Sequence, residues 1–165
     1  HAKITPDFIC LSKGLTGGYL PMSVTLTSDK IYNAFYDDDI KKGFLHSHSY
    51  TGNPLACSAA LGTLSIFESD KVLKKNLILS KKINRLFSSL EDLPISDLRN
   101  IGMIWAFELD SKISIDKVLA YSLNKGVLIR PIDNTIYFMP PYCIKETEAR
   151  QMIKVTREAI LYASA

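Results

Sequence analysis

The chain has 165 residues, of which 47% are hydrophobic and 22% are charged, so it can bury one good core or one core and part of a second. Its net charge of +3 comes from 20 basic and 17 acidic residues spread along the sequence, without the aromatic interleaving or recognised module of a nucleic-acid-binding protein. We therefore expect neither disorder nor a nucleic-acid partner, and, because charged residues interrupt the apolar runs, neither a signal peptide nor a membrane span.

The first informative stretch is residues 7–22, DFICLSKGLTGGYLPM. A short apolar run predicts a strand that ends just before Lys13, and a loop with three glycines follows before a second strand at 23–27. Glycine can adopt positive φ and lets the backbone pass close to a bound group. Because lysines at strand ends are mostly solvated and glycines mostly mark turns, this spacing alone leaves a solvated, functionless Lys13 as an open alternative.

A short helix to about residue 36 and a charged surface loop are predicted next, followed by the second informative stretch, GFLHSHSYTGNPLACSAALGTLSIFES at 43–69. Asn53 as N-cap, Pro54 at the first position and many small residues predict a helix packed closely against its neighbours. His46 and His48 lack a third ligand, so they form a poor zinc site, and we predict no metal. A structural role for this histidine pair and a phosphate held by hydroxyls at the helix N-terminus both stay open.

The rest of the chain predicts a smaller α/β unit that begins near Ser69. Basic residues opposite an apolar stripe predict a helix with one solvated face, and Gly126 is placed to end a later helix. The expected elements are a long helix at 71–93, strands at 96–99 and 103–109, a helix at 115–124, strands at 127–132 and 135–139, and a helix at 145–162.

The third informative stretch is GVLIRPIDNTIYFMPPYCI at 126–144, where Arg130 interrupts an apolar run. Burying an arginine is costly unless an anion meets its guanidinium group. A structural ion pair and a bound carboxylate, which the planar guanidinium can hold by two parallel hydrogen bonds, are equally compatible with the sequence.

Two further features of the sequence concern the cellular compartment of the protein and the completeness of the chain. Cys10, Cys57 and Cys143 lie far apart in apolar segments, which favours reduced, buried thiols in a cytoplasmic protein over disulfides or zinc. Since the chain starts at His1 and a strand is predicted almost at once, we expect the N-terminal part of a larger protein to precede it.

Taken together and in this order, the three stretches resemble the class III, fold type I aminotransferases that use pyridoxal 5'-phosphate, and the resemblance covers nearly the whole chain. It implies an α/β fold that is the C-terminal part of a fold type I pyridoxal-phosphate-dependent transferase. Residues 1–68 would be the end of the large coenzyme-binding domain, and residues 69–165 the small C-terminal α/β domain.

The resemblance also implies roles for individual residues. Lys13 takes the place of the lysine that holds the coenzyme as a Schiff base, and so it also meets the substrate. In the family, the segment matching 46–61 crosses the interface of a homodimer with shared active sites. Ser49 would bind the coenzyme phosphate of the partner subunit, with His48 beside it and Ser47 near the substrate.

The stretch at 126–142 is similar to the biotin-pathway branch of the family, in which Arg130 would meet the carboxylate of the oxo-acid substrate and Tyr137 would line the site. This implies amino transfer to 8-amino-7-oxononanoate, giving 7,8-diaminononanoate, with S-adenosylmethionine, or else lysine, as donor. Another class III ω-amino-acid or diamine transaminase, or a non-catalytic domain of the same fold, stay as alternatives. The family's phosphate-binding turn, stacking aromatic residue and aspartate for the pyridine nitrogen would lie upstream of His1, so residues 1–165 alone are expected to be inactive.

Overall fold

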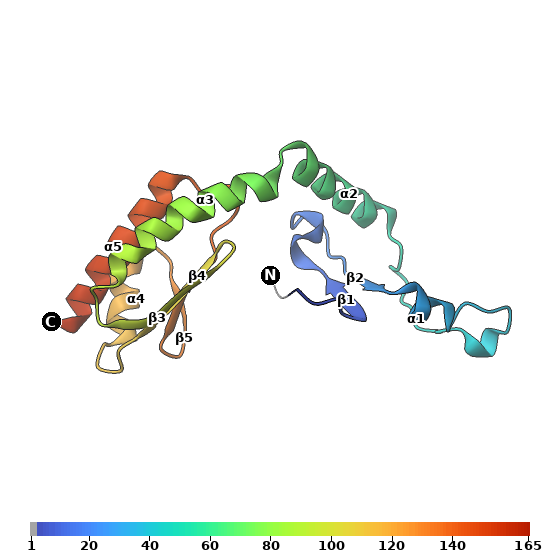
Figure 1. Cartoon of the computed structure of the whole chain (residues 1–165), viewed down its shortest axis with the longest axis horizontal. Helices are drawn as coiled ribbons and strands as arrows, with labels where there is room; N and C mark the ends of the chain where they lie inside the picture. The colour runs from blue at the N-terminus through green and yellow to red at the C-terminus, as the bar shows by residue number, and fades with distance from the viewer. Residues whose placement is uncertain (1–2) are drawn as a thin grey trace. The chain divides into compact units, whose positions relative to one another are not determined.

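The computed structural model describes residues 3–165, and the chain divides into two compact units (Figure 1). The first unit runs to Lys71 and the second from Val72 to Ala165, whereas the sequence placed the boundary between residues 68 and 69. Each unit has a sheet of its own, with two strands in the first unit and four in the second.

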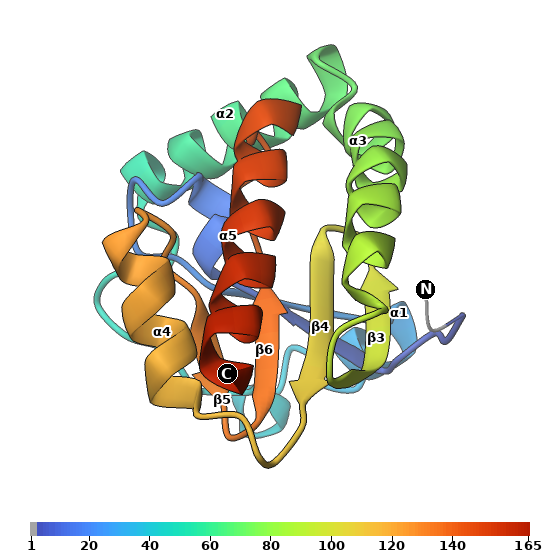
Figure 2. The ribbon, with the colours of Figure 1, turned by 90° about the vertical axis from the view of Figure 1, so that its left-hand side faces the viewer.

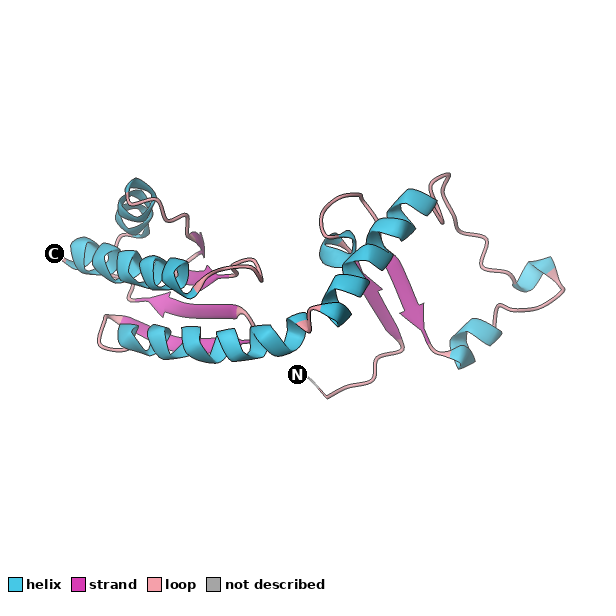
Figure 3. Cartoon of the chain, turned by 90° about the horizontal axis from the view of Figure 1, so that it is seen from above, coloured by secondary structure: helices cyan, strands magenta, loops and turns pink. Residues whose placement is uncertain are grey.

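The first unit is a hairpin followed by short helical turns and one long helix (Figure 3). In chain order its elements are β1 (Phe8–Leu11), the 3₁₀ turn η1 (Lys13–Thr16), β2 (Val24–Thr27), α1 (Asp29–Asn33), the 3₁₀ turn η2 (Ile40–Lys42) and α2 (Pro54–Ser69). The strands pair antiparallel, so η1 lies in the connection between them. The side chain of Asn53 accepts the Leu55 N–H at 2.9 Å, and this confirms the predicted cap of α2.

The second unit is an antiparallel sheet with strand order β3-β4-β6-β5, combined with three helices. In chain order its elements are α3 (Val72–Phe87), the 3₁₀ turn η3 (Ser88–Leu90), β3 (Ile95–Ile101), β4 (Ile104–Leu109), α4 (Ile115–Asn124), β5 (Arg130–Ile132), β6 (Thr135–Phe138) and α5 (Glu146–Ser164). The helices α3, α4 and α5 lie over one face of this sheet (Figure 2).

The core of the second unit fills the space between that face and the helices. Alternate residues of β4 and β6 point into it, among them Trp105, Phe107 and Phe138, all at most 4% exposed. The Phe87 ring of α3 stacks on Trp105 with centroids 5.4 Å apart and meets Phe138 edge-on at 5.1 Å. The intervening residues, such as Tyr137, lie on the opposite, open face of the sheet.

The first unit has no comparable core within the described residues. Only Thr16, Ala56 and Ala60 are buried in it, and all four residues of β1 are exposed. The hydrophobic side chain of Phe8 is 56% exposed. A strand of this composition is normally covered, so its outer surface is suited to further contacts.

The structure corrects several predicted elements. The first short helix ends at Asn33 instead of residue 36, and the long helix ends at Phe87, where the hydroxyl of Ser89 donates to the Leu86 carbonyl in the tighter turn η3. The strand predicted at 127–132 begins only at Arg130. The residues before Arg130 instead complete the C-terminal cap of α4, because the N–H of Val127 donates to the Ser122 carbonyl at 2.9 Å.

Two smaller predictions have mixed outcomes. Gly126, with φ +77°, ends α4 in the left-handed conformation, as the sequence predicts. All three cysteines are free thiols, but Cys10 and Cys143 are exposed and Cys57 is half-buried, so the expectation of buried thiols was wrong. Two of them lie at surfaces that the chain leaves open, since β1 is uncovered and Cys143 follows the last strand.

Candidate active site

Lys13 begins η1 directly after the end of β1 and is exposed. Its φ of +52° lies in the left-handed region, which a non-glycine residue occupies at a cost of about 1–3 kcal/mol and keeps only when its surroundings fix it. Hydrogen bonds from Leu15 N–H to the Ser12 carbonyl (3.2 Å) and from Gly17 N–H to the Gly14 carbonyl (3.0 Å) close the turn. The lysine therefore has a defined backbone conformation and an accessible side chain.

The glycine loop packs against α2. Gly17 and Gly18 have φ of +63° and +85°, as the sequence led us to expect of glycines in this loop. A Cβ atom on Gly17 would lie 3.2 Å from the Thr63 hydroxyl of α2, so a side chain there would push the loop away from the helix. Thr16 is only 1% exposed, and its hydroxyl donates to the Leu20 carbonyl at 2.5 Å. Two of the small residues of α2, Ala56 and Ala60, are buried in this helix, which contacts the turn that carries the lysine.

His48 sits in a tight turn just before α2. Its Nδ1 accepts the Tyr50 N–H at 3.1 Å, and its own N–H donates to the Thr51 hydroxyl at 3.2 Å. A neutral imidazole whose Nδ1 accepts carries its proton on Nε2, which leaves an N–H donor for a ligand. Ser47 and Ser49 are exposed, and within residues 3–165 their hydroxyls make no hydrogen bond.

A groove of about 730 Å³ joins the chain after the glycine loop to this turn. It is lined by Leu20, Pro21, Met22 and Ser23 on one side and by His48, Tyr50, Thr51, Gly52, Asn53 and Ala56 on the other. Lys13, Ser47 and Ser49 are not part of the lining. The structure therefore brings His48, but not Lys13 or Ser49, into the groove formed by the continuation of the lysine loop.

Arg130 and Tyr137 are directly opposite each other on β5 and β6. Cross-strand partners of this kind have Cβ atoms about 4.5–5.5 Å apart on the same face of the sheet. The row continues through Ala106 on β4 to Arg99 on β3, on the open face. The second unit thus brings the two predicted substrate-binding residues together.

The two arginines of this row have different surroundings. Arg99 bonds the carboxylates of Asp97 at 2.6 Å and Glu108 at 2.9 Å. Arg130 is exposed, and among the described residues it has neither an ion pair nor a hydrogen bond through its side chain. The structural ion pair that the sequence left open is therefore not formed within residues 3–165: Ile129, just before β5, is buried, whereas Arg130 is exposed.

Glu108 is the acidic group of this open face. A hydrogen bond from the Thr135 hydroxyl at 2.7 Å and, next, the bond from Arg99 hold the pKa of its carboxyl below its ordinary value. The negative charge of Glu108 is therefore balanced by Arg99 within the sheet. Arg130 remains the cation of this row whose charge no described residue balances.

Sequence reasoning missed some residues of this region. Thr16 was passed over as one more loop residue, although it is the last residue with a side chain before the glycine pair Gly17 and Gly18. The pairing of Arg99 with Glu108 depends on strand register, and no local pattern in the sequence could have predicted it.

The sequence and the fold were then compared with known proteins. The profile of the family described as aminotransferase class-III matches residues 1–160. The chain belongs to the class III aminotransferase family. Adenosylmethionine-8-amino-7-oxononanoate aminotransferase of Helicobacter pylori is 48% identical over 163 residues, which are 93% of this chain and 37% of that relative. The protein of the same name from Methanocaldococcus jannaschii is 39% identical over 168 residues, or 94% of this chain and 36% of the relative.

Solved structures of class III relatives share the fold. The crystal structure of the Methanocaldococcus jannaschii enzyme superimposes with a TM-score of 0.88 at 38% identity, covering 98% of this chain and 40% of that one. A Bacillus anthracis aminotransferase gives 0.87 at 27% identity, covering 97% and 40%. The fold is therefore α/β, that of part of a fold type I transaminase. The chain spans well under half the length of these relatives.

Two searches for other kinds of site gave negative results. Within residues 3–165, no group of three or more His, Cys, Asp or Glu side chains is arranged to hold a metal ion. In the same described part of the chain, no helix combines the length and the apolar composition needed to cross a lipid bilayer.

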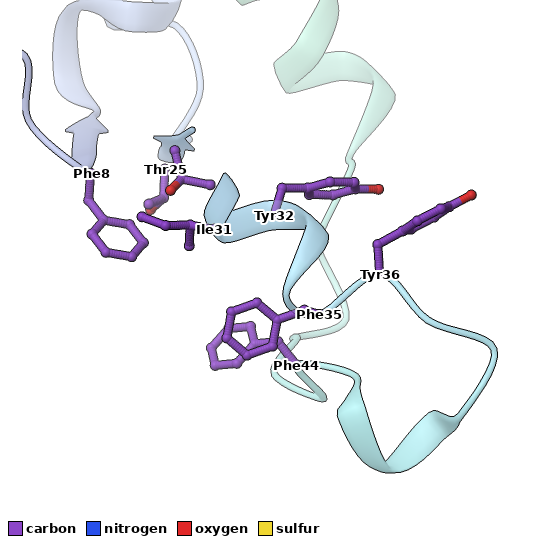
Figure 4. A pocket seen from close by; sticks show the side chains of 8 residues that line it. Phe8, Thr25, Ile31, Tyr32, Phe35, Tyr36 and Phe44 are labelled. Atoms are coloured by element: carbon purple, nitrogen blue, oxygen red, sulfur yellow. The ribbon is translucent and has the colours of Figure 1, made fainter. Parts of the chain in front are cut away.

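The first unit also has an open apolar pocket of about 570 Å³ (Figure 4). Its lining comes from β1, β2, α1 and the segment after η2: Phe8, Thr25, Thr27, Ile31, Tyr32, Phe35, Tyr36 and Phe44. The rings of Tyr32 and Tyr36 stack with centroids 5.5 Å apart, and those of Phe35 and Phe44 lie 5.8 Å apart. Exposed apolar surfaces of this kind are typical of contacts with further polypeptide.

Proposed function

We propose that this chain belongs to a pyridoxal 5'-phosphate-dependent enzyme that transfers an amino group to 8-amino-7-oxononanoate in biotin biosynthesis, with S-adenosylmethionine as the donor. The observation that carries the proposal is the exposed Lys13, held in a left-handed backbone conformation by a packed glycine loop, in a chain 48% identical to a relative named for this reaction. The name of that relative supports both the acceptor and the donor.

The side chains present fit the coenzyme. Its aldehyde requires a primary amine, and its phosphate requires hydrogen-bond donors. Lys13 offers the amine, beside open space at Gly14 and Gly18, where an added Cβ would meet no atom within 4 Å. Ser49 and the Nε2–H of His48 offer donors in the segment that leads into α2.

When bound, the coenzyme supplies an electron sink that stabilises the carbanion formed at the donor's α-carbon. The task of the chain is then to move a proton. The amine nitrogen of Lys13 would take up the proton released from the donor's α-carbon and would deliver it again on the product side of the reaction. Both proton movements require the lysine to be held in one position, which the fixed turn favours.

We assign binding of the oxo-acid to Arg130, Tyr137 and Ser47. The guanidinium group of Arg130 has no partner among the described residues, so a substrate carboxylate could take both of its parallel donors. Tyr137 lies beside it on the same face of the sheet and would line the site. The exposed hydroxyl of Ser47 completes the set near the coenzyme.

We also propose that the enzyme is a homodimer with shared active sites. Ser49 would bind the coenzyme phosphate of the partner subunit, and its hydroxyl, which is exposed and makes no hydrogen bond within residues 3–165, is available for this contact. The apolar pocket of Figure 4 supports contact with further polypeptide. The same proposal places the enzyme in the cytoplasm, which its three unpaired thiols support.

The test uses the full-length protein. Added pyridoxal 5'-phosphate should produce the yellow colour of lysine-bound coenzyme. Borohydride should bleach this colour and leave the coenzyme permanently attached to Lys13. Lys13→Ala should abolish turnover without lowering the thermal midpoint. Lys71→Ala is the matched control, because Lys71 is also exposed and also has a left-handed φ, of +51°. A protein that stays colourless favours a non-catalytic domain, and amino transfer only to other ω-amino or diamine acceptors favours a different class III transaminase.

A further inference from the structure

We propose that Thr16 is a positioning residue for Lys13: its buried hydroxyl fixes the turn that keeps the lysine in its left-handed conformation. The inference rests on the proposed function of Lys13. Thr16 touches neither substrate nor coenzyme in this account, and it acts only through the backbone of the loop.

The burial of Thr16 is exceptional for its unit. Among the described residues up to Lys71, it is the only polar side chain that is buried, with 1% of its surface exposed. Its hydroxyl is satisfied by the Leu20 carbonyl at 2.5 Å. A buried hydroxyl with a single backbone partner ties together the two ends of the segment that it joins, because breaking the bond would leave the buried hydroxyl without a partner.

The position of that bond links it to the lysine. Thr16 is the last residue of the 3₁₀ turn that Lys13 begins, so the two share one closed turn. On the far side, Leu20 lines the groove that contains His48. The bond therefore ties the lysine turn to the wall of the groove, while α2 packs against the same turn.

The strain at Lys13 explains why such a tie is needed. A left-handed lysine relaxes to the ordinary region unless its neighbours prevent the change. The hydrogen bonds within η1 close the turn and the Tyr19 N–H bonds the Thr16 carbonyl at 3.3 Å, while the Thr16 hydroxyl is the side-chain contact that extends the tie to Leu20. Without this hydrogen bond, Lys13 would keep its amine, but its side chain would no longer be held in one direction.

The experiment compares two variants of the full-length protein. Thr16→Val keeps the shape and removes the hydroxyl, while Thr16→Ser keeps the hydroxyl and removes a methyl group. We expect Thr16→Val to lower kcat by about 100-fold, as expected for a misplaced catalytic group, with the KM for the oxo-acid unchanged. The pH midpoint of the visible absorbance of lysine-bound coenzyme should shift in Thr16→Val, and Thr16→Ser should restore both kcat and the midpoint to near wild type.

Thr156→Val is the matched control. Thr156 is fully buried in α5, and its hydroxyl also donates to a backbone carbonyl, that of Met152 at 2.8 Å. This variant should lower the thermal midpoint about as much as Thr16→Val and leave kcat and the spectrum unchanged. Wild-type kcat and spectrum in Thr16→Val, or equal damage in the serine and valine variants, would overturn the inference.

Failure of the proposed function would look different. In that case the wild-type protein itself would not form the lysine-bound colour. Amide hydrogen exchange of residues 13–20 in the coenzyme-free protein then decides the inference alone. Faster exchange there in Thr16→Val than in Thr156→Val supports it, and equal exchange overturns it.

Discussion

Arg130→Ala is the substitution that most directly tests the assignment of the substrate site. Because the side chain of Arg130 is exposed and has no partner among the described residues, its removal should leave the fold and the thermal midpoint unchanged. The loss should fall on binding of the oxo-acid, whose carboxylate would no longer meet the guanidinium group.

The magnitude follows from the bond that is lost. A hydrogen-bonded pair with a charged group contributes about 1.5–3 kcal/mol, and about 1.4 kcal/mol corresponds to a factor of ten. The KM for 8-amino-7-oxononanoate should therefore rise by about 10-fold to about 150-fold, while the half-reaction with the donor keeps its rate.

Arg99→Ala is the control, since Arg99 lies at the other end of the same row of the sheet but is already paired with Asp97 and Glu108. Its loss should leave the KM for the oxo-acid nearly unchanged. Steady-state kinetics and single-turnover measurements of each half-reaction in the full-length protein distinguish the two variants. The reasoning is refuted if Arg130→Ala slows only the donor half-reaction, or if Arg99→Ala raises the KM equally.

Two other predictions concern assembly and pH. Mixing a Ser49→Ala protein with a Lys13→Ala protein should restore part of the activity, because hybrid dimers would contain one intact shared site. The activity is assayed after subunit exchange, and no recovery of activity counts against shared active sites. The Arg157 guanidinium bonds both carboxylate oxygens of Asp92 and holds the pKa of that carboxyl below its ordinary 3.8. The pair therefore stabilises the fold above about pH 3.8. The thermal midpoints of wild type and Asp92→Asn should differ at pH 7 and converge as the pH falls through the lowered pKa of Asp92. A difference between the two midpoints that persists in acid contradicts this prediction.

The sequence was most informative where local rules decide the structure. Asn53 and Pro54 define the start of α2, and Gly126 defines the end of α4, because caps depend on the backbone of one turn. The same reasoning failed at residues 127–129, where a run suited to a strand is used partly for the cap of the preceding helix. Competition between two local signals was resolved by packing, which the sequence alone does not display.

The candidate site was predictable only as separate pieces. The lysine loop and the histidine turn were each recognisable, and the pairing of Arg130 with Tyr137 follows once the hairpin register is known. The exposure of individual side chains was harder to predict from the sequence. An apolar run around an arginine indicates burial, yet Ile129, just before β5, is buried while Arg130 beside it is exposed.

The same contrast in burial leads to a last prediction, that residues 1–165 by themselves will not catalyse transamination. The second unit has a continuous core, whereas the first buries only three residues within its described part. Ile9 and Leu11, on the strand that leads to the lysine, are 42% and 41% exposed. A strand holds a catalytic side chain rigidly only when both it and its neighbours are packed, so Lys13 needs polypeptide beyond these residues to be fixed for chemistry.

The relatives that match the chain are more than twice its length, which is consistent with such a requirement. The isolated chain should therefore unfold with one cooperative transition that belongs to residues 72–165, and coenzyme should neither bind to it stoichiometrically nor raise its thermal midpoint. Visible absorbance and half-transamination with S-adenosylmethionine and with lysine, measured beside the full-length protein, test this. Stoichiometric binding together with amino transfer in the isolated chain would show that the exposed strand is rigid enough alone, and that the packing argument for Lys13 is wrong.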